Sequence, residues 1–129
     1  AGFEQFITKL RSIGVKTAVV TSSNRPKMEN VYAKHPEFKT YFDEVLTSED
    51  FAKSKPDPDC YLKAAQKFGA NVDECVGFED SFNGLKSLRG ANMAIVGLAT
   101  TNSKETISKY ADKVIDNYLG FNPSDVFFE

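Results

Sequence analysis

Several side chains suited to phosphate or metal chemistry stand where apolar runs end in this 129-residue sequence. Thr21 and Ser22 close the β-branched run at 16–21, and Glu79 and Asp80 close the apolar run at 75–80. Lys55 lies in a polar loop with two prolines, between the run at 42–47 and the next helical pattern. Each of these residues is therefore expected at or near the end of a strand.

A hydroxyl with neighbouring backbone N–H groups, one lysine and a pair of carboxylates suit a phosphate bound beside a hard divalent cation. Hydroxyl and amide donors hold phosphate oxygens, the ammonium offsets their charge, and carboxylates bind Mg²⁺. In open parallel sheets, ligands bind beyond the carboxyl ends of the strands, which is where these residues are expected. The pattern therefore predicts a site for a phosphate and Mg²⁺.

The hydrophobic periodicity predicts strands that alternate with helices. Strands are expected over 16–21, 42–47, 75–80, 92–99 and 113–116. Helices are expected over 3–13, from about Pro26 to before Pro36, from a cap at Asp57 to Gly69, over 81–90 and over 103–110. In the third helix the shared apolar face is expected to hold Tyr61, Leu62, Ala65 and Phe68. This alternation predicts an α/β fold with a doubly wound, mostly parallel sheet, covered by helices on both faces.

Composition excludes several kinds of partner. A formal net charge of -2 with scattered lysines argues against nucleic acid. No apolar run approaches the roughly 20 residues of a membrane span, and the first residues lack the pattern of a signal peptide. Cys60 and Cys75 are expected to be small buried hydrophobes in a reducing compartment. We therefore expect a cytoplasmic domain whose partner is neither nucleic acid nor a membrane.

Three segments match the motifs of a known family, in the family's order and strand contexts. VVTSSN at 19–24, SKPDPD at 54–59 and GFEDSFNG at 77–84 are similar to the second, third and fourth motifs of the haloacid dehalogenase-like hydrolases. The chain resembles the branch with phosphoglycolate phosphatase-like and β-phosphoglucomutase-like enzymes, from residue 3 to about 118. The resemblance implies a Rossmann-like core and Mg²⁺-dependent phosphoryl transfer on a small phosphorylated metabolite.

The resemblance also implies a role for each matched residue. Thr21 supplies a phosphate-binding hydroxyl, Ser22 a phosphate-facing backbone N–H, and Lys55 the cation near the phosphate and the nucleophile. Asp80 becomes a Mg²⁺ ligand, and Glu79 a second acid that touches the metal or orders its water. Family members transfer the phosphoryl group through an aspartyl-phosphate, which divides one difficult displacement into two easier ones.

The sequence departs from the family at the first motif, an apolar strand that ends in Asp-x-Asp. The only Asp-x-Asp, Asp57 and Asp59, follows AKSKP and belongs at a helix start. The resemblance therefore implies that residues 1–129 are the C-terminal core portion of a longer hydrolase, with nucleophile, first strand and cap domain upstream.

In the family the absent strand is central, between the strands with the second and fourth motifs. Its absence should leave unpaired N–H and C=O groups there. The missing segment, or another chain, is expected to complete the sheet, and these 129 residues alone are expected to be inactive.

Each candidate residue also has a purely structural interpretation. The acid pair suits a helix start, where carboxylates are favoured, and the two hydroxyl residues suit helix caps. Lys55 alone would be an ordinary surface lysine. Gly84 suggests close packing against the sheet, because Gly within a helix costs about 1 kcal/mol relative to Ala. Phe127 and Phe128 are expected to pack on the core or to form a subunit contact.

Two other functional classes share part of this pattern. A signalling receiver domain also combines acids, a hydroxyl and a lysine at strand ends, but it carries the acids first and the lysine last. A non-catalytic binding module on the same fold is the second alternative, because a fold alone does not determine activity. The residues leave open the substrate and the choice between phosphatase and phosphomutase chemistry.

Overall fold

The computed structural model describes residues 2–53, 55–100, 102–119 and 121. Its strands are β1 (Ala18–Val20), β2 (Glu44–Leu46), β3 (Val76–Glu79), β4 (Ala94–Leu98) and β5 (Lys113–Ile115). Its helices are α1 (Phe3–Ser12), α2 (Arg25–Lys34), η1 (Pro36–Tyr41), α3 (Asp59–Phe68), η2 (Val72–Glu74), α4 (Phe82–Gly90) and α5 (Lys104–Ser108). The expected contacts of Phe127 and Phe128 lie outside the described residues.

The helix ends follow the local signals in the sequence. The Asn24 side chain accepts a hydrogen bond from the Lys27 N–H at 3.0 Å and caps α2. Gly69 adopts the left-handed conformation, with φ 64°, and ends α3. All five expected strands and all five expected helices are present, but β1 and β2 are half the expected length and α2 begins at Arg25, one residue before Pro26. The short 3₁₀ helices η1 and η2 were not predicted.

The prediction for α3 was wrong in two details. The helix begins at Asp59, and Asp57 lies before it, where its carboxylate accepts the Asp59 N–H at 2.9 Å. Leu62 is 41% exposed. The buried face is formed by Cys60, Tyr61, Ala64 and Ala65. Tyr61 and Ala65 lie one helical turn apart and share that face. Leu62 follows Tyr61 directly, so its side chain is rotated by about 100° around the helix axis and leaves the buried face.

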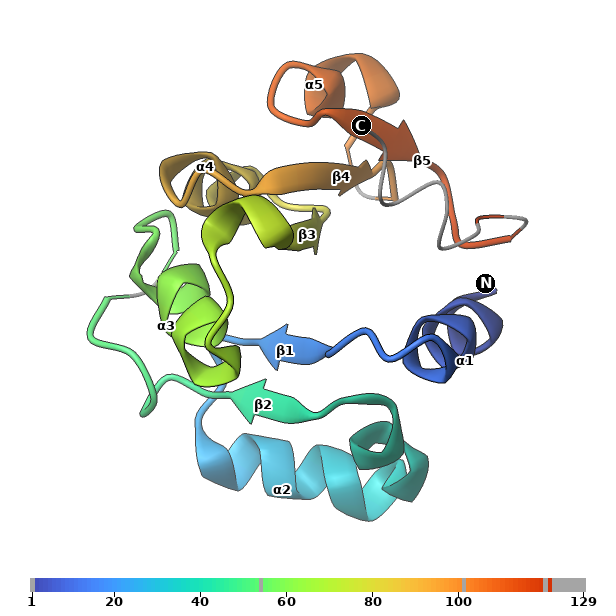
Figure 1. Ribbon diagram of the computed structural model, residues 1–129, viewed down its shortest axis with the longest axis vertical. Coiled ribbons are helices and arrows are strands. Elements are labelled where there is room, and N and C mark those ends of the chain that lie inside the picture. The colour runs from blue at the N-terminus through green and yellow to red at the C-terminus, as the bar shows by residue number, and fades with distance from the viewer. Residues whose placement is uncertain (1, 54, 101, 120, 122–129) are drawn as a thin grey trace.

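The parallel sheet is divided into two parts. β1 pairs with β2, and β3, β4 and β5 pair in that order; every pairing is parallel. Figure 1 shows the two parts separated between β1 and β3, with α3 on one side of this opening and α1 on the other. The division therefore falls between the strands that precede Thr21 and Asp80, where the resemblance implied unpaired edges.

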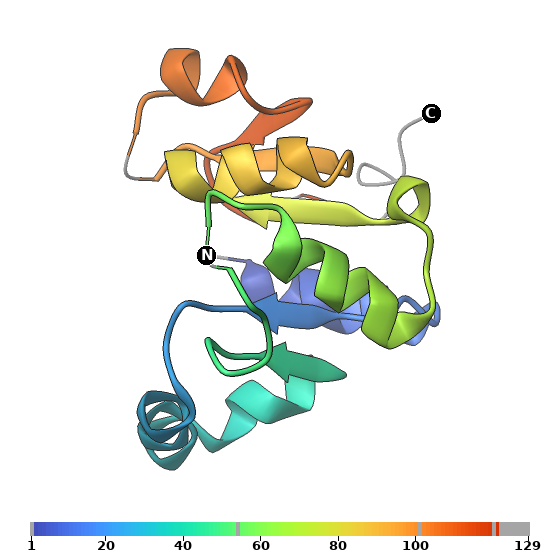
Figure 2. The ribbon, with the colours of Figure 1, turned by 90° about the vertical axis from the view of Figure 1, so that its left-hand side faces the viewer.

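Helices cover both faces of the strands. One apolar cluster joins α3, α4 and α5 to the strands, and the other joins α1 to the opposite face. Adjacent residues of β4, Ile95 and Val96, belong to different clusters, because successive side chains of a strand point to opposite faces. Figure 2 shows the molecule from the side of α3 and α4, with α1 behind β1.

Both cysteines are free thiols, Cys60 buried and Cys75 half-buried. Burial raises the pKa of the Cys75 thiol, so this thiol stays protonated near neutral pH. Among the described helices, none is both long and apolar enough to cross a membrane.

Candidate functional site

A cavity of about 670 Å³ fills the opening between β1 and β3. We call this cavity, bounded by Ala18–Val20 and Val76–Glu79, the slot. Its walls come from α1 and α3 and are mostly apolar, and Lys55 and Glu79 also line it. The slot is therefore an apolar space inside the sheet with charged groups at one end.

Backbone polar groups of both strands point into the slot. The Thr17 carbonyl and the Thr21 N–H form hydrogen bonds with the segment that contains β2. In a parallel strand every second residue bonds to the same neighbour, so the backbone groups of Ala18 and Val20 point away from β2. By the same alternation, the Cys75 carbonyl bonds toward β4, and alternate residues of β3 face the slot. These slot-edge residues are Ala18, Val20, Val76 and Phe78. Among the described residues no strand pairs with either edge, as the resemblance to the family implied.

Lys55 joins the carboxyl ends of the two strands. Its Nζ donates a hydrogen bond to the Val20 carbonyl at 3.2 Å and forms an ion pair and a hydrogen bond with Glu79 Oε2. Val20 is the last residue of β1 and Glu79 the last of β3. The two strands therefore end at the same edge, and Lys55 stands over that edge.

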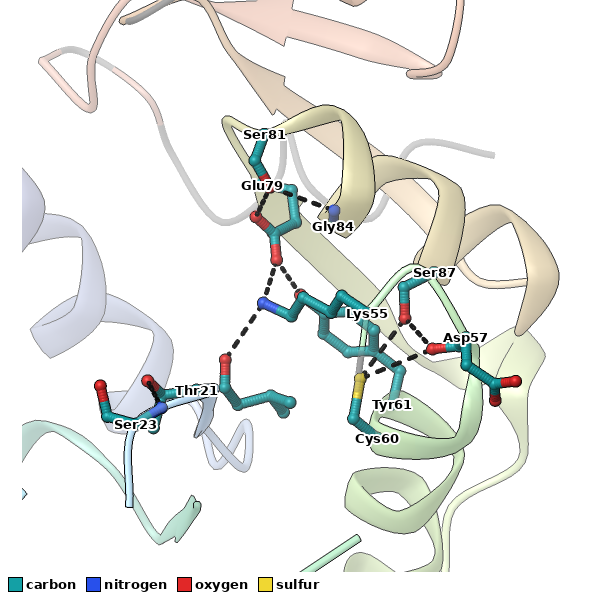
Figure 3. A network of polar contacts seen from close by, with 11 residues as sticks. Thr21, Ser23, Lys55, Asp57, Cys60, Tyr61, Glu79, Ser81, Gly84 and Ser87 are labelled. Carbon is teal, nitrogen blue, oxygen red and sulfur yellow. Dashed lines mark hydrogen bonds and ion pairs between the residues drawn. The ribbon is translucent and has the colours of Figure 1, made fainter. Parts of the chain in front are cut away.

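The Glu79 carboxylate is buried, with 8% of the residue exposed, and is held by several donors (Figure 3). Its Oε2 accepts hydrogen bonds from Lys55 Nζ and the Tyr61 hydroxyl, and its Oε1 accepts one from the Ser81 hydroxyl at 3.4 Å. Behind it lies Gly84, where an added Cβ would overlap the carboxylate. The expected close packing at Gly84 is confirmed, and the neighbour that requires it is Glu79.

Thr21 and Ser22 follow β1 in the turn toward α2. Thr21 Oγ1 accepts the Ser23 N–H at 3.1 Å, which leaves the hydroxyl proton of Thr21 able to donate to a ligand. Ser22 is exposed. Neither residue lines the slot, but Thr21 directly follows Val20, whose carbonyl binds Lys55.

Asp80 begins the turn between β3 and α4. Its Oδ2 accepts a hydrogen bond from the Thr100 hydroxyl at 3.3 Å, and its backbone carbonyl accepts one from Asn102 Nδ2 at 3.3 Å. Asp80 is half-buried and does not line the slot. The loop after β4 thus supports the turn that carries Asp80.

The donor set fits a Mg²⁺ ion in part. Among the described residues, one long hydrogen bond, from Thr100, engages the Asp80 carboxylate, whereas the Glu79 carboxylate is already bound by Lys55 and Tyr61. Within the described part of the chain, no group of three or more acidic, His or Cys side chains surrounds a common point. Since hard divalent cations take six or more oxygen ligands, this chain supplies only some of them.

Burial and the two neighbouring acids shift the pKa of two phenols near the slot. Burial, together with the charges of Asp80 and Glu79, raises the pKa of Tyr118 to about 12. Burial also raises the pKa of Tyr61, and the neighbouring Glu79 charge adds to the increase. Both phenols stay protonated at neutral pH, and Tyr61 acts there as a donor.

The tertiary structure connects Lys55 directly to Glu79 and places Thr21 next to the Lys55 acceptor. The Asp80 carboxylate instead accepts a hydrogen bond from Thr100, in the loop after β4. From the sequence, Tyr61 was expected on an apolar helix face, with no role in the site. A signal was available, since a phenol on a helix face otherwise made of Cys and Ala needs a hydrogen-bond partner when it is buried.

The model of the haloacid dehalogenase-like hydrolase family matches residues 1–92. The chain belongs to this family. A bifunctional riboflavin kinase/FMN phosphatase from Arabidopsis thaliana is 27% identical to this chain over 118 residues, with 92% of this chain and 31% of the relative covered. The chain is thus related to phosphatases and spans about half or less of the length of the curated relatives it matches.

Solved structures of the family share the fold of this hydrolase core. CbbY from Rhodobacter sphaeroides, in one structure with phosphate and in another, of a mutant, with xylulose-(1,5)-bisphosphate, has a TM-score of 0.84 at 24% identity, with 98% of this chain and 58% of CbbY covered. A family IA hydrolase from Entamoeba histolytica has a TM-score of 0.89 at 22% identity, with 97% of this chain and 57% of that chain covered.

Proposed function

We propose that this chain is the C-terminal core portion of a Mg²⁺-dependent phosphatase or phosphomutase that transfers a phosphoryl group through an aspartyl-phosphate. The observation that carries the proposal is Lys55. Its ammonium joins the carboxyl ends of β1 and β3 above an open slot, so a cation stands where a central strand between them would end.

The residues of this chain act mainly by binding and positioning the phosphate. The Thr21 hydroxyl and the Ser22 N–H donate to phosphate oxygens, and Lys55 stabilises the negative charge of the transferred group. Lys55 has three N–H donors, of which one binds Val20 and one binds Glu79, so one remains for the phosphate.

The nucleophile is an aspartate carboxylate that the slot-filling segment brings to the same edge. Its oxygen attacks phosphorus while the bond from phosphorus to the leaving oxygen breaks. In the phosphatase reaction, water then attacks the aspartyl-phosphate and releases inorganic phosphate. In the phosphomutase reaction, a sugar hydroxyl takes the place of that water.

Mg²⁺ would be held by Asp80, with further ligands from the slot-filling segment, the phosphate and water. When bound, it offsets the charge of the phosphate. Glu79 directly precedes Asp80, and its carboxylate would contribute to Mg²⁺ binding through a water.

The segment that we propose for the slot is an extended apolar strand, parallel to β1 and β3 and encoded upstream of residue 1. The slot is bounded by the three residues of β1 and the four residues of β3, so a strand of similar length would pair with both. Such a strand satisfies the backbone groups of the slot-edge residues on both sides.

The substrate class that we propose is a small phosphorylated metabolite. The polar groups at the edge of the slot suit one phosphate group, and the CbbY structures hold phosphate or a sugar bisphosphate. A cap domain outside this chain would select among such molecules.

The proposal is tested by hydrolysis of p-nitrophenyl phosphate with Mg²⁺. The 129 residues alone are expected to show no turnover, and the chain extended by its slot-filling segment is expected to be active. In the extended protein, Lys55→Ala is expected to lower kcat at least about 100-fold, and Asp80→Asn to raise the Mg²⁺ concentration needed for half-maximal rate. Lys63→Ala and Asp73→Asn, two exposed positions, are the matched controls.

Turnover by the isolated chain would contradict the slot-borne nucleophile. Wild-type rates for Lys55→Ala would contradict the role of Lys55. An inactive extended protein that still binds phosphorylated ligands would instead favour the binding module.

A further inference from the structure

Tyr61 has a polar group that packing does not explain. The residue lies on the buried face of α3 with 9% of its surface exposed, beside Cys60, Ala64 and Ala65. A phenylalanine would fill the same space. A buried hydroxyl is costly unless it is hydrogen-bonded, so its role lies in the bond it makes.

The Tyr61 hydroxyl and the Lys55 ammonium converge on one oxygen. Both donate to Glu79 Oε2, and Lys55 Nζ also lies 5.2 Å from the centroid of the Tyr61 ring. The ring and the hydroxyl of Tyr61 thus contact the two members of the ion pair. Figure 3 shows these three side chains grouped at the end of β3.

The carboxylate between them has little freedom. Gly84 leaves just enough room for it on the side of α4, and the Ser81 hydroxyl binds its other oxygen. Without the phenol, Lys55 would be the one donor to Oε2 among the described residues. The direction of the Lys55 side chain therefore depends on Tyr61 through Glu79.

We propose that Tyr61 is a positioning residue for phosphoryl transfer: its hydroxyl fixes the Glu79 carboxylate, which aims the remaining N–H of Lys55 at the phosphate. This inference rests on the proposed function. It assigns Glu79 to the alignment of Lys55 in addition to any contact with metal-bound water.

The test is Tyr61→Phe in the chain extended by its slot-filling segment. We expect kcat for p-nitrophenyl phosphate to fall about tenfold, with KM changed less than about threefold. The far-UV circular dichroism spectrum, which reports secondary structure, should stay unchanged. Gly84→Ala, which displaces the carboxylate from the opposite side, is expected to lower kcat in the same way. Tyr110→Phe is the matched control, because Tyr110 is half-buried and packs on Phe82 through its ring.

A second measurement is independent of activity. In NMR spectra of the 129-residue chain, the Lys55 ammonium protons are expected to exchange with water at least about tenfold faster in Tyr61→Phe than in the wild type or Tyr110→Phe. A purely structural role for Tyr61 would lower thermal stability and leave this exchange unchanged.

The outcomes separate this inference from the proposed function. If Lys55→Ala abolishes turnover while Tyr61→Phe keeps wild-type kcat and ammonium exchange, Tyr61 has no positioning role and the proposed function stands. If Lys55→Ala itself retains full activity, the proposed function fails, and the ammonium exchange alone decides whether Tyr61 orders the ion pair.

Discussion

Asp50 holds together the loop that follows β2 and faces the start of α2. Its Oδ2 accepts the Thr47 N–H at 2.8 Å and the Thr47 hydroxyl at 3.1 Å, and its Oδ1 pairs with Arg25 at 3.3 Å. The hydrogen bond from the Thr47 N–H is the largest cause that lowers the pKa of Asp50. At the scale of single residues, this carboxylate links two segments of the chain.

Asp50→Asn is expected to lower the free energy of unfolding at pH 7 by about 1–2 kcal/mol, because hydrogen bonds to a charged acceptor are stronger than those to an amide. The folded pKa lies below the unfolded one, so the stabilisation is fully present above about pH 4. It is lost as the pH falls through the folded pKa.

Urea unfolding between pH 2 and pH 7 measures this dependence. The difference between wild type and Asp50→Asn should shrink toward acid pH, whereas Asp116→Asn, at an exposed position, should match the wild type throughout. A difference that stays constant with pH would assign the effect to packing instead of charge.

At the scale of elements, α2 shows how local signals position the site. Asn24 caps the helix, Pro26 occupies its first turn, and the chain leaves the helix before Pro36. The turn that precedes this cap contains Thr21 and Ser22. The start of α2 therefore determines where the two proposed phosphate ligands stand relative to β1.

Asn24→Ala is expected to destabilise the protein by about 1 kcal/mol, because the Lys27 N–H loses its acceptor. Asn24→Asp should retain stability, since aspartate caps equally well. Chemical denaturation measures both variants. Asn30→Ala, at an exposed position within α2, should stay within about 0.5 kcal/mol of the wild type. Equal effects of Asn24→Ala and Asn30→Ala would show that the cap contributes nothing specific.

At the scale of the whole molecule, the division of the sheet is the dominant feature. Two strand edges face each other across an apolar cavity, and one ammonium spans their ends. An edge of this kind binds further strands unless it is covered. Under the proposed function, a single strand would both fill the slot and bring the nucleophile, so one segment would complete the sheet and the site.

Hydrogen exchange tests this feature residue by residue. In the 129-residue chain, amides of the slot-edge residues are expected to exchange at least about tenfold faster than those of Val19 and Gly77, which face paired strands. Protection of the slot-edge amides should rise when the slot-filling segment is present.

Full protection of these amides in a 14.3 kDa monomer would contradict an open slot. Protection that depends on protein concentration would show that a second copy of the chain fills the slot, and would contradict the upstream segment as its occupant.

The order of the elements and the parallel fold were accessible from the sequence, because periodicity, caps and motif spacing are local properties. The same motifs supplied the candidate site residues, whose roles stay predictions. The partners of those residues were not. Lys55 and Glu79 are 24 positions apart, Tyr61 and Glu79 are 18 apart, and Lys55 reaches a carbonyl 35 positions away.

Only the tertiary structure decided that a core tyrosine binds the acid of the site and that Gly84 makes room for that acid. It also decided that Asp80 turns toward the loop after β4 while Glu79 turns toward Lys55. Each of these outcomes depends on the packing of α3 and α4 against β3. Packing is a property of several elements together, and no single segment of the sequence encodes it.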